Sequence, residues 1–159
     1  MTIKVGDRIP NVTVYEMSDK GPSEITTDAI FSGKKVVLFA LPGAYTPTCS
    51  ASHLPGYVVY ADAILDKGVE RIVCLSVNDA WVMDAWGKSH HAEKILMLAD
   101  GSADLTQALG LELDLTKRGM GVRSDRYAMI VEDGVVTHLN REAPGKFEVS
   151  DAETILKLL

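Results

Sequence analysis

The stretch KKVVLFAL, residues 34–41, decides how this chain folds. It is a continuous apolar run rich in β-branched residues, and it ends at Pro42 and Gly43. Such a run is typical of a strand that is buried on both faces, as in the centre of a parallel sheet. VERIVCLSV, residues 69–77, has the same character. Two buried central strands are therefore predicted.

The residues between these two runs follow a helical pattern. Thr46 is a candidate N-cap, with Pro47 at the first helical position. Apolar residues then recur at helical spacing up to Gly68, namely Leu54, Val58, Ala61 and Leu65. Because Pro55 removes one backbone hydrogen bond, a kink is expected near residues 51–55. The strand, helix and strand together predict a βαβ unit with a right-handed crossover.

The rest of the chain continues the alternation of helices and strands. The patterns predict a helix over 79–92, a strand over 95–100 and a helix over 102–110. Two apolar runs within 125–140, joined at Asp133-Gly134, predict a β-hairpin. Ser150 and Glu153 form a candidate capping box before a last amphipathic helix. We expect an α/β fold in one domain, residues 1–159, whose mixed central sheet has helices on both faces.

Composition and charge exclude several classes of protein. The chain has 159 residues, 47% of them hydrophobic, and 16 basic against 22 acidic residues give a net charge of −6. The basic residues are scattered, which disfavours nucleic-acid binding. No apolar run approaches the roughly 20 residues of a membrane span. The N-terminal MTIKVGDRIP has no basic segment followed by an apolar one, so a cytoplasmic location is expected.

Two cysteines are candidates for chemistry. Cys49 falls in the first turn of the predicted helix, where free backbone N–H groups and the helix dipole favour an anion. Cysteines in such positions ionise easily, and the thiolate is the nucleophilic form. The alternative is that Cys49 is a buried, inert residue, as many cysteines are. Cys74 lies within a predicted strand, where packing alone explains it.

Four further residues surround this cysteine in the prediction. The hydroxyl of Thr46 can reach the same point as the thiol, and Pro42 would shield the approach to it. His53 follows one turn later, but a Cys and a His are too few ligands for a metal site, and no CxxC or HxxxH motif adds others. Arg126 is either an edge charge or, if its strand lies beside the first turn, a partner of the thiolate.

PGAYTPTCSASHLPGY, residues 42–57, closely resembles the active-site segment of the peroxiredoxins. Pro42, Thr46 and Cys49 fall on the PxxxTxxC pattern of that family. The segments over 73–87, 96–115 and 123–136 are similar to its type II, or peroxiredoxin-five, branch. The resemblance covers nearly the whole chain.

The resemblance implies a thioredoxin-like fold and an antioxidant activity, the reduction of hydrogen peroxide and alkyl hydroperoxides by a thiol. It makes Cys49 the peroxidatic cysteine, places Thr46 and Arg126 on the other catalytic positions, and makes Pro42 the residue that covers the site. No metal, haem or flavin cofactor is expected.

The resemblance also bears on the partners of the protein. Some relatives carry a resolving cysteine near the C-terminus, where this chain has Val149. We therefore expect an external thiol to resolve the sulfenic acid, with glutathione and glutaredoxin favoured and thioredoxin second. Members of the branch commonly form homodimers, for which Tyr45 and Trp81 are candidate interface residues.

Two other functions are consistent with parts of the sequence. A thioredoxin-type disulfide oxidoreductase fits the βαβ pattern, but it requires a CxxC motif, and Thr46 stands at the first cysteine position. A redox sensor or scaffold would use the same oxidation of Cys49 to signal to a bound partner. Turnover separates a peroxidase from a sensor, because a sensor stops after one equivalent of peroxide.

Overall fold

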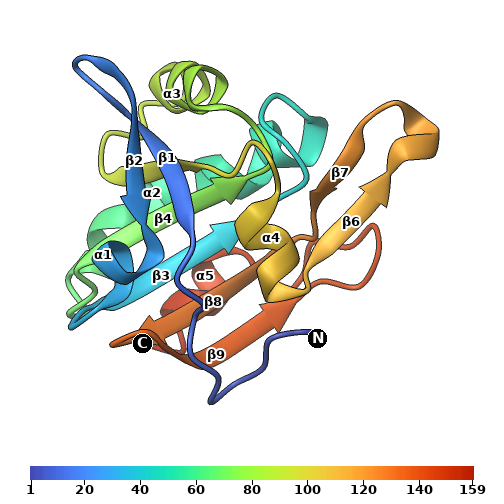
Figure 1. Ribbon diagram of the computed structural model, residues 1–159. Coiled ribbons are helices and arrows are strands. Elements are labelled where there is room, and N and C mark those ends of the chain that lie inside the picture. Colours follow the sequence, from blue (N-terminus) through green and yellow to red (C-terminus); the bar gives the residue numbers. More distant parts are fainter.

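A seven-stranded mixed sheet forms the centre of the computed structural model, which describes residues 1–159 (Figure 1). The strand order is β2-β1-β5-β4-β3-β8-β9. These strands are β1 (Thr13–Ser18), β2 (Gly21–Thr26), β3 (Lys35–Ala40), β4 (Arg71–Ser76), β5 (Ile95–Ala99), β8 (Tyr127–Glu132) and β9 (Val135–Arg141). A separate two-stranded sheet consists of β6 (Glu112–Leu115) and β7 (Gly121–Ser124), which are joined by the 3-10 helix η2 (Thr116–Arg118).

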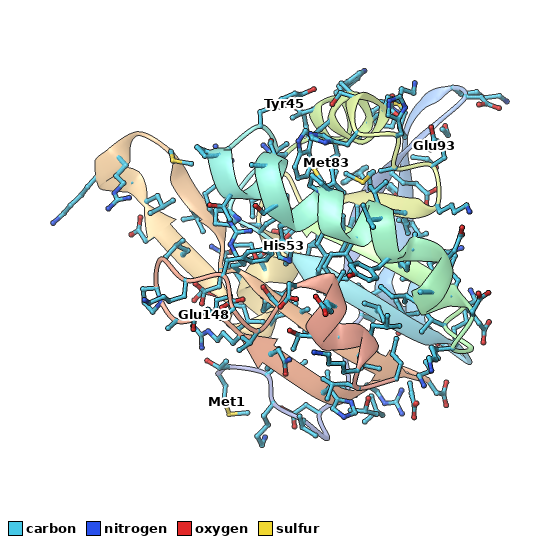
Figure 2. All side chains as sticks on the ribbon, turned by 180° about the vertical axis from the view of Figure 1, so that it is seen from behind. Met1, Tyr45, His53, Met83, Glu93 and Glu148 are labelled. Atoms are coloured by element: carbon cyan, nitrogen blue, oxygen red, sulfur yellow. The ribbon has the colours of Figure 1, made fainter.

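Helices cover both faces of the large sheet. They are α1 (Thr27–Phe31), α2 (Leu54–Leu65), α3 (Ala80–Ser89), α4 (Asp104–Leu109) and α5 (Ala152–Leu156), with a π-helical turn η1 (Cys49–His53) before α2. The view in Figure 1 has α4 in front of the sheet, and the reverse view in Figure 2 has α2 and α5 in front. The predicted α/β architecture with helices on both faces is confirmed.

The predicted βαβ unit is present at the centre of the sheet. Strands β3, β4 and β5 are parallel, and α2 connects β3 to β4. Strand β8 then pairs antiparallel with β3 on its other side, and β9 pairs antiparallel with β8. This arrangement brings the start of β8 beside the end of β3, where the chain turns toward η1.

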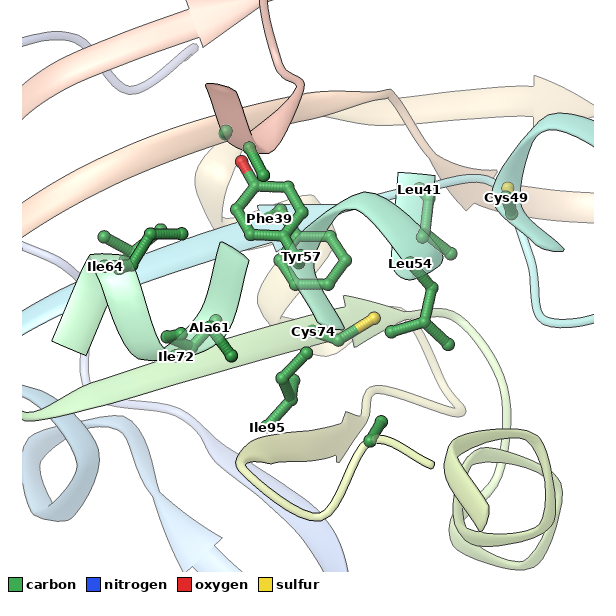
Figure 3. Packing of buried hydrophobic residues seen from close by; sticks show 14 of the residues in the cluster. Phe39, Leu41, Cys49, Leu54, Tyr57, Ala61, Ile64, Ile72, Cys74 and Ile95 are labelled. Carbon is green, nitrogen blue, oxygen red and sulfur yellow. The ribbon is translucent and has the colours of Figure 1, made fainter. Parts of the chain in front are cut away.

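The sheet separates two apolar clusters, and β3 contributes to both. Val37 and Phe39 face the cluster under α2, α3 and α5, whereas Val36 and Leu38 face the opposite one. Because successive side chains of a strand point to opposite faces, a strand covered on both sides must be apolar throughout. The ring of Phe39 stacks on that of Tyr57 from α2 at a centroid distance of 3.9 Å (Figure 3).

The buried face of α2 differs slightly from the predicted one. Leu54 and Ala61 are buried as predicted, but Tyr57 and Ile64 complete the buried stripe. Val58 and Leu65 are only partly buried. Both sets follow helical spacing of three or four residues from Leu54, so the spacing alone does not decide which of two neighbouring apolar positions faces the core.

Most other predicted elements are confirmed, and the capping box is wrong. Asp133 and Gly134 both have positive φ angles, 48° and 78°, as a two-residue hairpin turn requires. The last helix is capped by Asp151, whose side chain accepts a hydrogen bond from the N–H of Thr154. The Ser150 hydroxyl instead donates to Glu142 at 2.7 Å, so it is not available as the cap.

Two hairpins of the structure have no counterpart in the sequence predictions. One is formed by β1 and β2 at the edge of the large sheet, and the other by β6 and β7. Their strands consist mostly of exposed or partly buried residues, and neither hairpin contains a continuous apolar run. No helix of the structure combines the length and the apolar character needed to cross a membrane.

Candidate active site

The segment after β3 builds a helical start around Cys49. The helix begins at Pro47, directly after Thr46, as predicted, and the Ser50 N–H donates to the Thr46 carbonyl at 3.0 Å. The Thr46 hydroxyl does not cap the helix but donates to the carbonyl of Gly43 at 2.7 Å. Cys49 therefore lies in the first turn of the helix, as the sequence predicts.

The helix opens with a π turn at the position where a kink was expected. The N–H of Leu54 donates to the carbonyl of Cys49, five residues earlier, instead of to a residue four earlier. Pro55 has no N–H to donate and its ring would clash with the carbonyl of an α-helical turn, so the wider turn relieves both problems. Cys49 and His53, at the two ends of this turn, point toward the same neighbour.

That neighbour is Arg126. Its Nη2 donates to the sulfur of Cys49 at 3.2 Å. Arg126 precedes β8, and the register pairs Tyr127 with Ala40 at the end of β3, so its side chain reaches the turn that carries Cys49. The strand that follows Arg126 thus lies beside the first turn of the helix, which was the condition for Arg126 to be a partner of Cys49. The residue Cys49 is fully buried, which leaves the guanidinium as its charged partner.

His53 binds this arginine. The sequence predictions assign it no role, because one cysteine and one histidine are too few ligands for a metal site. Its Nδ1 accepts from Arg126 Nη1 at 2.8 Å, so the ring proton lies on Nε2 and is donated to the Ser150 carbonyl at 3.1 Å. Burial, together with the charge of Arg126, lowers the pKa of His53 to about 3. The imidazole is therefore neutral near pH 7 and acts as an acceptor for the guanidinium.

A loop from the C-terminal part of the chain anchors His53 in turn. The Ser150 carbonyl also accepts a hydrogen bond from the Tyr57 hydroxyl at 2.8 Å. Glu142 holds the loop by accepting hydrogen bonds from the N–H groups of residues 148–150 and from the Ser150 hydroxyl. Burial would raise the pKa of Glu142, but these hydrogen bonds outweigh it and lower the pKa below its ordinary value. The carboxylate is therefore ionised and fixes the loop.

Phe147 completes the wall beside the arginine. The guanidinium carbon of Arg126 lies 5.7 Å from the centre of its ring, a cation–π distance. The ring of His53 lies 4.9 Å from the same ring. Arg126 is thus held by a hydrogen bond on one side and by an aromatic face on another, and its second amino group remains directed at Cys49.

The other predicted site residues lie around this centre. Pro42 and Thr48 line a cleft of about 1060 Å³ that also reaches Arg126, and the Pro42 carbonyl accepts from Arg123 at 3.3 Å. Thr46 makes no hydrogen bond with the Cys49 sulfur, because its hydroxyl proton is directed to Gly43. The structure therefore places Pro42, Cys49 and Arg126 together and has Thr46 in the adjoining turn.

Cys74 has the packing role that the sequence predicts. It is fully buried in β4, and burial, reinforced by the nearby Cys49, raises the pKa of its thiol well above the ordinary value. In the view of Figure 3 the side chains of Leu41 and Leu54 lie between the two cysteines. The structure has no group of three His, Cys, Asp or Glu side chains that could hold a metal ion.

The arrangement suits nucleophilic chemistry by a thiolate. A guanidinium within hydrogen-bond distance stabilises the anionic sulfur and offers a donor to a polar substrate that approaches it. The neutral His53 keeps that guanidinium in place without competing for the sulfur. Because the thiol is fully buried, only a small reactive group can reach it.

Comparison with known proteins agrees with this chemistry. The Redoxin family model matches residues 4–156. Peroxiredoxin-2C of Arabidopsis thaliana is 46% identical, with 99% of this chain and 98% of the relative covered. The solved structure of reduced Prx3 from Vibrio vulnificus in complex with hydrogen peroxide is 56% identical, covers 99% of both chains and has a TM-score of 0.96.

A more distant structure extends the likeness. The antioxidant protein of Plasmodium falciparum, a 1-Cys peroxiredoxin, is 30% identical with a TM-score of 0.90 and covers 98% of each chain. These folds confirm the expected thioredoxin-like architecture. The chain belongs to the Redoxin family and, within it, to the type II or peroxiredoxin-five peroxiredoxins, which are thiol-dependent peroxidases.

Proposed function

We propose that Cys49 reduces hydroperoxides by direct attack on the O–O bond. The thiolate attacks one peroxide oxygen, an S–O bond forms and the O–O bond breaks with both electrons going to the departing oxygen. The departing oxygen takes up a proton and leaves as water or an alcohol, and Cys49 becomes a sulfenic acid. The observation that carries this proposal is the 3.2 Å contact between Arg126 Nη2 and the Cys49 sulfur.

Arg126 has two parts in this step. Its charge stabilises the thiolate before the reaction, and its N–H groups donate to the oxygen that becomes negative as the bond breaks. A well-placed donor of this kind contributes about 3 kcal/mol to the transition state. The Thr46 hydroxyl oxygen, which keeps free lone pairs, accepts a hydrogen bond from the peroxide, and Pro42 covers the site. The related Prx3 of Vibrio vulnificus, whose structure is a complex with hydrogen peroxide, supports hydrogen peroxide as a substrate.

The oxidised enzyme is returned to the thiol by an external reductant. One thiol attacks the sulfenic acid, which releases water and forms a mixed disulfide, and a second thiol releases Cys49 and leaves as a disulfide. The buried position of Cys74 and the presence of Val149 support an external rather than an internal partner. Glutathione with glutaredoxin is the first candidate and thioredoxin the second. The related Plasmodium protein is likewise described as a 1-Cys peroxiredoxin.

The proposal includes a homodimer. Tyr45 and Trp81 are 58% and 66% exposed, unusual for aromatic residues, and Tyr45 stands in the turn that leads to Cys49. Large exposed aromatics are enriched at protein interfaces. Sedimentation of the wild type and of Trp81→Ser tests this part, because the variant should shift toward the monomer.

Peroxide consumption tests the proposed function directly. The wild type should consume hydrogen peroxide steadily with glutathione and glutaredoxin, and more slowly with thioredoxin and its reductase. Cys49→Ser should abolish turnover, and the matched Cys74→Ser should keep most of it. Consumption that stops after one equivalent with both reductants would show a redox sensor instead.

A further inference from the structure

The cleft beside Arg126 is far larger than hydrogen peroxide requires. Its volume of about 1060 Å³ compares with roughly 30 Å³ for a water molecule in the liquid. One wall is β6 with η2, and the other is the loop of residues 142–147. Figure 2 shows the hairpin of β6 and β7 and the C-terminal loop on the same side of the molecule. The cleft can therefore hold a molecule much longer than the peroxide group.

Cations without a carboxylate partner line the outer part of this cleft. Lys117 and Arg118 come from η2, and Lys146 faces them from the opposite wall. None of the three takes part in a salt bridge, whereas six other basic residues do. Together with Arg126 at the inner end, they give the cleft four positive side chains against three carboxylates, those of Asp114, Asp125 and Glu142.

The carboxylates of the same cleft are already engaged. Asp125 forms a 2.6 Å salt bridge with Arg141. Asp114 accepts hydrogen bonds from the backbone and hydroxyl of Thr116, which lower its pKa. Glu142 is occupied by the N–H groups of residues 148–150 and by a serine hydroxyl. Asp114 and Glu142 keep their negative charge, but none of the three acids forms a salt bridge with an outer cation.

We propose that Lys117, Arg118 and Lys146 form a subsite for a carboxylate on a small molecule that reacts at Cys49. This inference rests on the proposed function, since it places the reacting oxygen or sulfur of that molecule at the inner end of the cleft. Leu113, Leu115 and Phe147 line the space between and accommodate a hydrocarbon or peptide stem. The molecule is either a hydroperoxide that carries a carboxylate or the carboxylate-bearing thiol that reduces the sulfenic acid.

A comparison of acids with their esters tests the subsite. The first arm measures oxidation of the wild type by linoleic acid hydroperoxide and by its methyl ester. The second arm measures reduction of the sulfenic acid by glutathione and by glutathione diethyl ester. Stopped-flow fluorescence follows both arms, because the buried Trp86 donates to Ser50, next to Cys49, at 3.0 Å. The variant Lys117→Gln/Arg118→Gln/Lys146→Gln is compared with Lys20→Gln/Lys67→Gln/Lys157→Gln, which removes three exposed charges elsewhere.

In at least one arm the wild type should react about tenfold faster with the acid than with its ester, the effect of two or three exposed ion pairs. The triple variant of the cleft should abolish this ratio, and the control variant should keep it. An effect in the first arm identifies a substrate, and an effect in the second identifies the reductant. Equal acid and ester rates in the wild type, or a ratio that the cleft variant leaves unchanged, would overturn the subsite. The reaction of the wild type with hydrogen peroxide, measured alongside, tests the proposed function separately.

Discussion

Protonation of His53 should destabilise the fold at mildly acidic pH. In the unfolded chain a histidine has a pKa of about 6.5, whereas burial and the charge of Arg126 lower the pKa of His53 to about 3 in the folded protein. Between these values the unfolded chain binds a proton that the folded protein excludes. The contribution of His53 to stability is therefore complete above pH 6.5 and is lost as the pH falls toward 3.

The size of the effect follows from the linkage between proton binding and folding. One proton contributes about 1.4 kcal/mol per pH unit once the unfolded histidine is fully protonated, and at pH 6.5 it is only half protonated. The free energy of unfolding should therefore fall by about 2.3 kcal/mol between pH 6.5 and pH 4.5 through His53 alone. Other acids, Glu142 among them, add to the measured loss. A variant in which only His53 cannot titrate isolates its share.

Urea unfolding between pH 7 and pH 4.5, followed by tryptophan fluorescence, measures this share. His53→Gln keeps an oxygen to accept from Arg126 and an N–H to donate to the Ser150 carbonyl, but it does not titrate. Between pH 7 and pH 4.5 the wild type should therefore lose about 2.6 kcal/mol more of its free energy of unfolding than His53→Gln loses. His91→Gln, at an exposed position, serves as control and should run parallel to the wild type. Parallel curves for His53→Gln as well would refute the neutral, buried histidine.

Three further substitutions test neighbouring contacts. Cys74→Ser should lower the free energy of unfolding by about 1–3 kcal/mol in urea titrations, because it buries a hydroxyl without a built partner, while a peroxide assay should find turnover largely kept. Glu142→Gln should cost about 1–3 kcal/mol of stability at pH 7, since an amide cannot accept all the hydrogen bonds of the carboxylate. Phe147→Leu removes the aromatic face beside Arg126 and should slow stopped-flow oxidation by hydrogen peroxide about threefold, as expected for a cation–π contact of 0.5–1 kcal/mol; an unchanged rate would show that the ring does not position the guanidinium.

The sequence predicts the strands that are buried on both faces of the sheet. Residues 36–41 and 72–75 are apolar throughout because helices cover both sides of β3 and β4. The hairpins β1–β2 and β6–β7 lie at an edge or apart from the sheet. Half-exposed strands of this kind have a weaker hydrophobic pattern, and nothing in their local sequence distinguishes them from a loop.

The site is predictable only as far as its contacts are local. The position of Cys49 in a first helical turn follows from Thr46 and Pro47, which are its neighbours in sequence. The role of His53 does not, because its partners Arg126 and Ser150 stand 73 and 97 residues away. The wrong prediction at Ser150 has the same cause. Its local sequence fits a capping box, but its hydroxyl donates to Glu142, which lies outside the helix.

The rate constant for oxidation of Cys49 by hydrogen peroxide in Arg126→Met tests the central claim most directly. Stopped-flow fluorescence compares this variant with the wild type and with Arg71→Met, which removes an arginine from the other end of the sheet. Loss of a donor worth about 3 kcal/mol predicts a rate constant about 100-fold lower for Arg126→Met, with Arg71→Met close to the wild type. A rate constant for Arg126→Met within twofold of the wild type would contradict the account.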